Sequence, residues 1–168
     1  MAEIVGNEVL ENSDVARDLW NKSQFGSKQG KGTICFSPLE ALYLLELEKI
    51  TITQPKGYDF SKAFKKFMRT DKQLAQRYAV YKELRSRGYV VKTALKFGAD
   101  FRVYEKGSKP GETHAKWVVF AVRETHSQSW QAFSAKNRVA HSTKKKLLIG
   151  VVDDESDVTF FEVGWVKP

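Results

Sequence analysis

The sequence predicts an α/β (α+β) fold with a small N-terminal αβ domain, residues 1–70, and a C-terminal domain, residues 71–168. Helical and strand-like runs alternate in the first half, whereas the part after Gly88 consists mainly of strand-like runs. The length of 168 residues suits one compact domain or two small ones. Hydrophobic residues make up 42% of the chain, which is enough to build a core.

The first part of the chain is predicted to form two strands, a helix and a loop. Two short strands around a turn at Gly6 and Asn7 are predicted by the run EIVGNEVLE. A short helix with Ser13 as its N-cap is predicted by SDVARDLWNK. A connecting loop is predicted by the three glycines of FGSKQGKG.

A second helix is expected in the run SPLEALYLLELEK. Ser37 is its N-cap, Pro38 its first residue, and Glu40 completes a capping box. The buried stripe of this helix is predicted to consist of Leu39, Leu42 and Leu45. A strand, ITIT, and a turn, QPKG, follow it. We expect Cys35, the single cysteine, to be a small buried hydrophobic residue.

Two helices with a break near Thr70 and Asp71 are predicted for residues 59–88. The apolar face of the first consists of Phe60, Phe64 and Phe67. The apolar face of the second consists of Leu74, Tyr78, Tyr81 and Leu84. Gly88 is suited to end the second helix, because glycine adopts the left-handed conformation of a helix C-terminus without strain.

A mixed, largely antiparallel sheet flanked by helices is predicted after Gly88. Its strands are expected in YVVKTA, DFRVYEK, HAKWVVFAV, KLLIGVVD and DVTFFEVGWV. Between the third and fourth of these runs, an amphipathic helix is predicted by SWQAFSAKNRVAHS.

The chain carries an excess of basic residues. Lys and Arg number 28 against 20 Asp and Glu, which gives a net charge of +8 and a pI near 9.5. Such an excess favours a polyanionic partner, nucleic acid first and an anionic membrane second. No run of 18 apolar residues and no signal-peptide pattern occurs, so we expect no membrane segment and a cytoplasmic location.

The sequence contains none of the common metal or nucleotide motifs. His114, His126 and His141 are widely separated, without paired cysteines or an HExxH spacing. The acidic run DDESD, residues 153–157, lacks the ligand spacing of a calcium loop and predicts an acidic hairpin loop. Phosphate-binding glycine loops and GxSxG are absent as well. We therefore expect neither a metal ion nor another cofactor.

A tyrosine, a histidine and a lysine remain as candidates in the strand-rich half. Tyr104 ends a predicted strand, and His114 begins the next one after a basic, glycine-rich loop. Singly, such a tyrosine is usually a packing residue and such a histidine a polar strand terminus. Together with a lysine they suit the cleavage of RNA by its own 2′-hydroxyl, which requires a base, an acid and a cation. The imidazole is the natural acid near neutral pH, and a phenol among cations can act as the base.

Three stretches of the second half closely resemble the catalytic half of archaeal tRNA-splicing endonucleases. They are YVVKTALKFGADFRVYEKG, THAKWVV and NRVAHSTKKKLLIGVVDDESDVTFFEVGWVKP, and they keep their spacing over most of residues 78–168. The first half resembles the N-terminal domain of that family less specifically, through FG…G…SPLEALYL. The resemblance implies a metal-independent enzyme that excises introns from precursor tRNA, and cuts other RNA, at bulge-helix-bulge sites. Its products would be 2′,3′-cyclic phosphate and 5′-hydroxyl ends.

The resemblance also implies roles for individual residues. Tyr104, which follows GADFR, corresponds to the general base, and His114 to the acid. Lys145 corresponds to the cation that stabilises the transition state; strand alternation sends it to the opposite face from both neighbouring lysines. Arg138 corresponds to an arginine that holds a bulged base of the RNA. Phe160, in the last strand, is the candidate to stack on that base.

The family acts as an assembly of four domain units. This implies a homotetramer, or a heterotetramer with a second endonuclease subunit. The acidic run resembles the loop that joins dimers in this family, so Asp153, Asp154 and Asp157 are candidates to reach a basic pocket on a neighbour. The closing strand, TFFEVGWV, would support the dimer.

Two other functions fit parts of the sequence. A non-catalytic RNA-binding structural subunit of the same splicing complex would lack the triad, whereas this chain has all three residues. A metal-dependent DNA nuclease would need carboxylates clustered beside its catalytic lysine, and none accompanies AHSTKKK.

Overall fold

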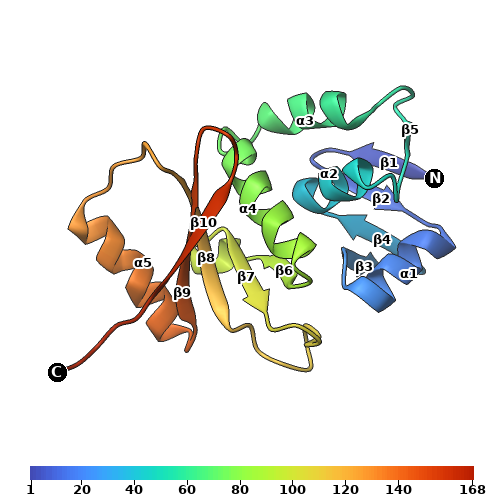
Figure 1. Ribbon diagram of the computed structural model, residues 1–168. Coiled ribbons are helices and arrows are strands. Elements are labelled where there is room, and N and C mark those ends of the chain that lie inside the picture. Colours follow the sequence, from blue (N-terminus) through green and yellow to red (C-terminus); the bar gives the residue numbers. More distant parts are fainter. The chain divides into compact units, whose positions relative to one another are not determined.

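The computed structural model describes residues 1–168 and divides into two compact units, Met1–Ala75 and Gln76–Pro168 (Figure 1). Each unit contains one five-stranded sheet together with helices. The predicted α/β (α+β) class is thereby confirmed. The predicted domain boundary at residue 70 falls in the short connection between two helices, just before the division that the structure makes.

The elements follow one another in two groups. The first unit contains β1 (Ala2–Val5), β2 (Glu8–Glu11), α1 (Asp14–Ser23), β3 (Ser27–Gln29), β4 (Thr33–Phe36), α2 (Pro38–Glu46), β5 (Ile52–Gln54) and α3 (Phe60–Met68). Next come α4 (Leu74–Ser86), β6 (Val90–Thr93), the short 3₁₀ helix η1 (Leu95–Phe97), β7 (Phe101–Tyr104), β8 (Trp117–Arg123), α5 (Trp130–Ser142), β9 (Lys146–Val152) and β10 (Val158–Val163). None of the helices is long and apolar enough to cross a membrane.

The first sheet has the strand order β3-β4-β2-β1-β5. β1 and β2 form the predicted hairpin, and Gly6 at its turn has a φ of 63°, a conformation that glycine adopts without strain. β5 pairs in parallel with β1 at one edge, and β3 forms the other edge.

The hairpin of β3 and β4 was missed by the sequence prediction, which placed a loop over β3 and no strand over β4. Gly30 and Gly32, with φ of 56° and 91°, make the tight turn between these strands. All three residues of β3 are exposed at the sheet edge, so no apolar alternation marks them. In β4 the buried residues form a continuous apolar run instead, in which Cys35 is 4% exposed, as predicted.

The helices of the first unit begin where the sequence predicts. Ser13 accepts a hydrogen bond from the Ala16 backbone N–H at 3.1 Å, and Ser37 forms the predicted capping box with Glu40. Helix α2 is buried more completely than a single stripe requires, since it contacts β2, β4 and α3. Its buried leucines are Leu39, Leu42 and Leu44, and the predicted Leu45 is only half-buried.

The second sheet has the strand order β10-β9-β8-β7-β6. All neighbouring strands are antiparallel except β8 and β9, which are parallel and are joined through α5. The predicted mixed, largely antiparallel sheet is thus confirmed. The predicted break between α3 and α4 is also present, and Gly88 after α4 has a φ of 90°.

Helices α4 and α5 cover opposite faces of the second sheet (Figure 1). On the α4 face, Gly150 lets the helix approach closely, because a Cβ there would lie 2.8 Å from Val80 Cγ2. Arg77 Nε donates to Asp100 Oδ1 at 2.6 Å, and Asp100 Oδ2 accepts from the Ala121 backbone N–H at 2.8 Å. These contacts attach α4 to the sheet.

The α5 face is packed by a separate hydrophobic cluster. Its buried members are Ala94, Ala99, Val118, Phe120, Ala140, Leu147 and Ile149. Phe97 and Phe133 pack against the same cluster and are half-buried. The residues at the rim of this face therefore lie beside a closely packed apolar cluster.

Candidate active site

Three strands of the second sheet bring their ends together. Because β7 is antiparallel to β8, and β8 is parallel to β9, the C-terminal end of β7 meets the N-terminal ends of β8 and β9. Two backbone hydrogen bonds of 2.9 Å join the three ends. Lys116 N–H donates to the Val103 carbonyl, and Lys146 N–H donates to the Lys116 carbonyl. Residues at these ends lie side by side across the sheet.

Each predicted catalytic residue comes from one of these ends. Tyr104 is the last residue of β7, His114 precedes β8 by three residues, and Lys145 directly precedes β9. Phe101 and Val103 share one face of β7, and this is the α4 face, because the centres of the Phe101 ring and of the Tyr81 ring in α4 are 5.9 Å apart. Tyr104 alternates with them along the strand and therefore lies on the α5 face. The structure thus brings the three segments together at one end of the sheet.

Packing fixes the tyrosine and the backbone beside the histidine. Tyr104 is 5% exposed and belongs to a small cluster with Val90 and Ala115. Ala115 directly follows His114, whose own side chain is exposed. The contact therefore holds the histidine segment against the buried phenol while the imidazole remains open to solvent.

The loop between these two residues is closed at its base by an ion pair. Lys116 Nζ donates to Glu105 Oε1, and this hydrogen bond raises the pKa of Lys116. Gly107 and Gly111 have positive φ, which lets the loop turn. Because Glu105 follows Tyr104 and Lys116 lies two residues after His114, the ion pair ties together the two arms that carry them.

A helix-terminating motif positions Lys145. Thr143 is the C-cap of α5, and Lys144 follows in the left-handed conformation with a φ of 56°. The Lys144 N–H donates to the His141 carbonyl at 3.0 Å, and the Lys145 N–H donates to the Ala140 carbonyl at 2.8 Å. This pair of bonds is a Schellman motif, which reverses the chain direction and places Lys145 at the start of β9.

The Lys145 ammonium lies at the C-terminal end of α5. Its Nζ donates to the Thr143 carbonyl at 3.0 Å and lies 5.5 Å from the centre of the Phe97 ring. Both the negative end of the helix dipole and the aromatic face favour a cation here. An ammonium has three N–H donors, so this geometry leaves donors for an anionic group.

The three consecutive lysines have different environments. Lys146, the first residue of β9, lies on the α4 side and donates to Glu162 Oε1 at 2.8 Å. This bond, with a second from Trp117 Nε1, lowers the pKa of Glu162. Strand alternation separates Lys145 from Lys146, as predicted, but not from Lys144, which lies outside the strand in a left-handed turn. Lys144 is exposed.

Arg138 lines a pocket together with a tryptophan that the sequence reasoning missed. The pocket has a volume of about 320 Å³ and is lined by Ser134, Asn137, Arg138, His141 and Trp165. The rings of His141 and Trp165 meet edge to face with centroids 4.0 Å apart, and Trp165 is 59% exposed. Since Trp165 follows the last strand, no periodicity marked it, and only its aromatic character could have drawn attention.

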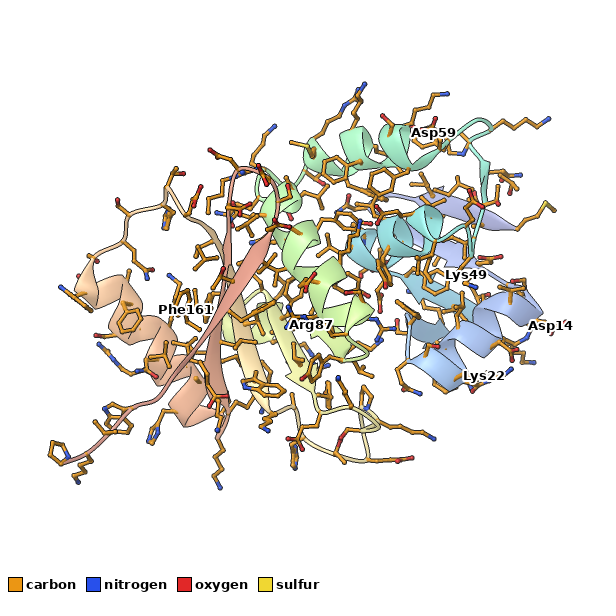
Figure 2. The ribbon with its side chains drawn as sticks, viewed as in Figure 1. Asp14, Lys22, Lys49, Asp59, Arg87 and Phe161 are labelled. Carbon is orange, nitrogen blue, oxygen red and sulfur yellow. The ribbon has the colours of Figure 1, made fainter.

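Phe160 does not share a site with Arg138 within one chain. It pairs with Gly150 on the α4 face, and the Arg87 guanidinium of α4 lies 5.7 Å from its ring centre. Arg138 belongs to α5, on the other face of the sheet. Phe161 (Figure 2) alternates with Phe160 and therefore faces the other way. Its side chain is 55% exposed.

Arg102 is a further cationic residue close to Tyr104. Arg102 lies two residues before Tyr104 in β7 and so shares its face of the sheet. Its Nε atom is buried and has no hydrogen-bond partner. The alternation of β7 could have identified Arg102, but the sequence reasoning did not single it out. The tyrosine is thus flanked on its strand by a guanidinium.

The acidic run forms the turn between β9 and β10, as predicted. Asp153 is committed to the turn itself, because its Oδ1 accepts from the backbone N–H groups of Glu155 and Asp157, both at 2.9 Å. The carboxylates of Asp154, Glu155 and Asp157 are exposed. Of the three predicted interface residues, Asp154 and Asp157 are therefore the two that face solvent.

The chemistry of this end of the sheet is that of acids, bases and cations. It presents a phenol, an imidazole and an ammonium, which can exchange protons and stabilise developing negative charge. No group of three or more His, Cys, Asp or Glu side chains is placed to hold a metal ion.

Comparisons with known proteins point to one family for both units. Residues 74–160 match the family model of the catalytic C-terminal domain of tRNA intron endonucleases, and residues 1–64 match that of their N-terminal domain. The chain is 37% identical over 166 residues to the tRNA-splicing endonuclease of Methanothermobacter thermautotrophicus, covering 98% of this chain and 96% of that protein. It is 41% identical to that of Thermococcus kodakarensis, over 89% of this chain and 87% of the relative. The tRNA-splicing endonuclease of Nanoarchaeum equitans is 43% identical over 77% of this chain and 88% of that protein.

Proposed function

This chain belongs to the tRNA intron endonuclease family, and we propose on that premise that it excises introns from precursor tRNA. The sites of cleavage are bulge-helix-bulge structures, in precursor tRNA and in other RNA that contains them. The second unit carries the reaction, with the catalytic domain over residues 71–168. One observation carries the proposal beyond family membership: the ends of β7, β8 and β9, which bear the phenol, the imidazole and the ammonium, meet side by side.

The proposed reaction is an internal transesterification. Tyr104, as the base, takes the proton of the 2′-hydroxyl, and the 2′-oxygen then attacks the adjacent phosphorus. The bond from phosphorus to the 5′-oxygen breaks, and His114 in its protonated form gives that oxygen a proton. Lys145 stabilises the negative charge on the phosphate oxygens. The products are a 2′,3′-cyclic phosphate and a 5′-hydroxyl, and the step requires no metal ion or other cofactor.

We assign the grip on a bulged base to Arg138 and Trp165. They line one pocket, where a guanidinium and an exposed indole can hold a base between them by stacking and cation–π attraction. Trp165 replaces Phe160 in this role, since Phe160 lies on the other face under Arg87. Trp165→Ala should therefore raise KM for the RNA, whereas Phe160→Ala should leave KM unchanged if the fold is retained.

The proposed active form is a homotetramer, or a heterotetramer with a second endonuclease subunit. The exposed carboxylates of Asp154 and Asp157 would reach a basic pocket on a neighbour, with Asp153 shaping the turn that presents them. Mass measurement of the chain expressed alone, followed by a cleavage assay, distinguishes the two assemblies. An inactive chain that gains activity with a partner would identify the heterotetramer.

One assay tests the proposed reaction. A bulge-helix-bulge RNA is incubated with the protein in EDTA, and the ends of the products are identified. Cleavage that leaves a cyclic phosphate and a 5′-hydroxyl supports the proposal. Binding without cleavage, in every assembly tried, would instead identify a non-catalytic RNA-binding subunit, and cleavage only after addition of a divalent metal would refute the mechanism.

A further inference from the structure

The first unit carries a concentration of positive charge that the proposed active site does not use. Residues 49–75 contain seven Lys and Arg against two Asp and Glu, whereas residues 1–48 contain four against eight. The unit is nearly neutral as a whole, because the net negative charge of residues 1–48 offsets the net positive charge of the segment around α3.

Four of these cations lie along one face of α3 and its C-cap residue, and we call this set the basic stripe. It consists of Lys62, Lys65, Lys66 and Arg69. At 100° per residue, the four positions fall within an arc of about 100°. The opposite face holds the apolar side chains, of which Ala63 and Phe67 are fully buried, and it is this face that packs in the unit.

Stabilisation of helix α3 does not account for all the cations of the basic stripe. A cation in the last turn is favoured by the helix dipole, which accounts for Lys65 and Lys66. Lys62, however, lies in the first turn, where the dipole opposes a positive charge. Its Nζ donates to the Gly57 carbonyl at 2.7 Å, and none of the four stripe residues forms an ion pair with a carboxylate. The positive charge of the stripe is therefore uncompensated.

We propose that the basic stripe of the first unit binds the sugar–phosphate backbone of the precursor tRNA, at a part of the RNA outside the bulge-helix-bulge. This inference rests on the proposed function, which supplies the polyanionic partner. From Lys62 to Arg69 the helix rises about 10 Å, which spans about three phosphates of one strand. Contacts of this kind position the RNA without reading its sequence.

The acidic turn of a second copy fits the stripe less well. The backbone N–H of Asp153 donates to the Asp157 carbonyl at 3.0 Å, so the turn is closed across one strand spacing of about 5 Å. Its exposed carboxylates are thus gathered at a narrow tip, whereas the cations are spread along a straight line of twice that length. The spacing of phosphates along an extended RNA backbone fits this row of cations better.

The test compares two double variants of the full chain. Lys65→Ala/Arg69→Ala removes two cations from the stripe. The matched control, Lys22→Ala/Lys49→Ala, removes two exposed cations of the same unit outside it (Figure 2). The Kd for RNA is measured by filter binding from 50 to 200 mM salt, with 2′-deoxy residues at the cut sites. Each protein is tested on an intact precursor tRNA and on a short RNA that contains only the bulge-helix-bulge.

For the intact precursor, the loss of affinity between 50 and 200 mM salt should be about tenfold smaller for the stripe variant than for the control, since two phosphate contacts are gone. For the short RNA, the affinity of the two variants should fall by the same factor between 50 and 200 mM salt. Equal salt dependence on the precursor would overturn the proposal and leave the stripe as a solvated surface. If the stripe variant lost affinity equally for both RNAs and its molecular mass in solution differed from that of the wild type, the stripe would be an interface between copies of the chain. Cleavage of the unmodified short RNA by the wild-type chain reports separately on the proposed function.

Discussion

The left-handed residue before the proposed catalytic lysine allows a sharp test of how that lysine is positioned. Lys144 has a φ of 56° in the Schellman motif that ends α5. A left-handed conformation costs a residue with a Cβ about 1–2 kcal/mol, and glycine adopts it freely but loses about 0.5–1 kcal/mol more backbone entropy on folding. Lys144→Gly should therefore stabilise the fold by about 0.5–1 kcal/mol. For a chain of this length, the Tm should rise by about 2 °C.

Lys144→Val is the contrasting change. A β-branched side chain is a strong outlier at positive φ, so this variant should lose about 1–2 kcal/mol and melt about 4 °C lower. Differential scanning calorimetry gives both Tm values, and single-turnover cleavage of a bulge-helix-bulge RNA gives the activity. Because the Lys144 side chain is exposed and Lys145 keeps its place, Lys144→Gly should retain wild-type turnover. A lower Tm for Lys144→Gly would refute the account of the turn, and loss of turnover in that variant would mean that Lys144 takes part in the reaction.

Three substitutions and one labelling experiment test the site and the core. His114→Ala and Lys145→Ala should each lower kcat by about 10²–10³-fold while RNA binding is retained, as measured by single-turnover kinetics and filter binding. Asp100→Asn should cost about 1.5–3 kcal/mol in urea unfolding, because it removes the charge-assisted bond from Arg77; an unchanged midpoint would contradict this. Burial raises the pKa of Cys35 to about 12, so at pH 8 a thiol reagent should label the folded chain very slowly and the urea-unfolded chain quickly. Since the pKa is higher in the folded state, the associated stability is complete below about pH 8.5 and is lost as the pH rises toward 12.

The elements that sequence patterns predicted correctly are those with strong local signals. The capping box at Ser37 and the glycine after α4 mark helix ends through chemistry that acts within a few residues. β3 was missed because its three residues are exposed at a sheet edge and have no alternation. The turn at Lys144 was missed for a related reason: a lysine gives no sign that its backbone is left-handed, whereas glycine would have done so.

The sequence could supply the residues of the candidate site but not their arrangement. Tyr104, His114 and Lys145 could be named from motifs, but only the strand order brings their segments together. The pairing of Arg138 with Trp165 depends on where the tail after β10 lies, and no repeat in the sequence encodes that. Within one chain Phe160 lies on the face opposite Arg138, which the sequence could not show, because alternation separates the two faces of β10 without saying which one α5 covers.

The parallel pairing of β8 with β9 has a consequence for the order in which the site assembles during folding. Val103 and Trp117, which align β7 with β8, are 14 residues apart, whereas Trp117 and Lys146, which align β8 with β9, are 29 apart. Closing the longer loop through a helical crossover costs more chain entropy and is slower than forming the hairpin. The tyrosine and histidine arms should therefore come together first, and Lys145 should join them late. Under the proposed mechanism, a chain caught between these stages would have an ordered hairpin but would lack the proposed stabilising cation, so it could not cut RNA before its fold is complete.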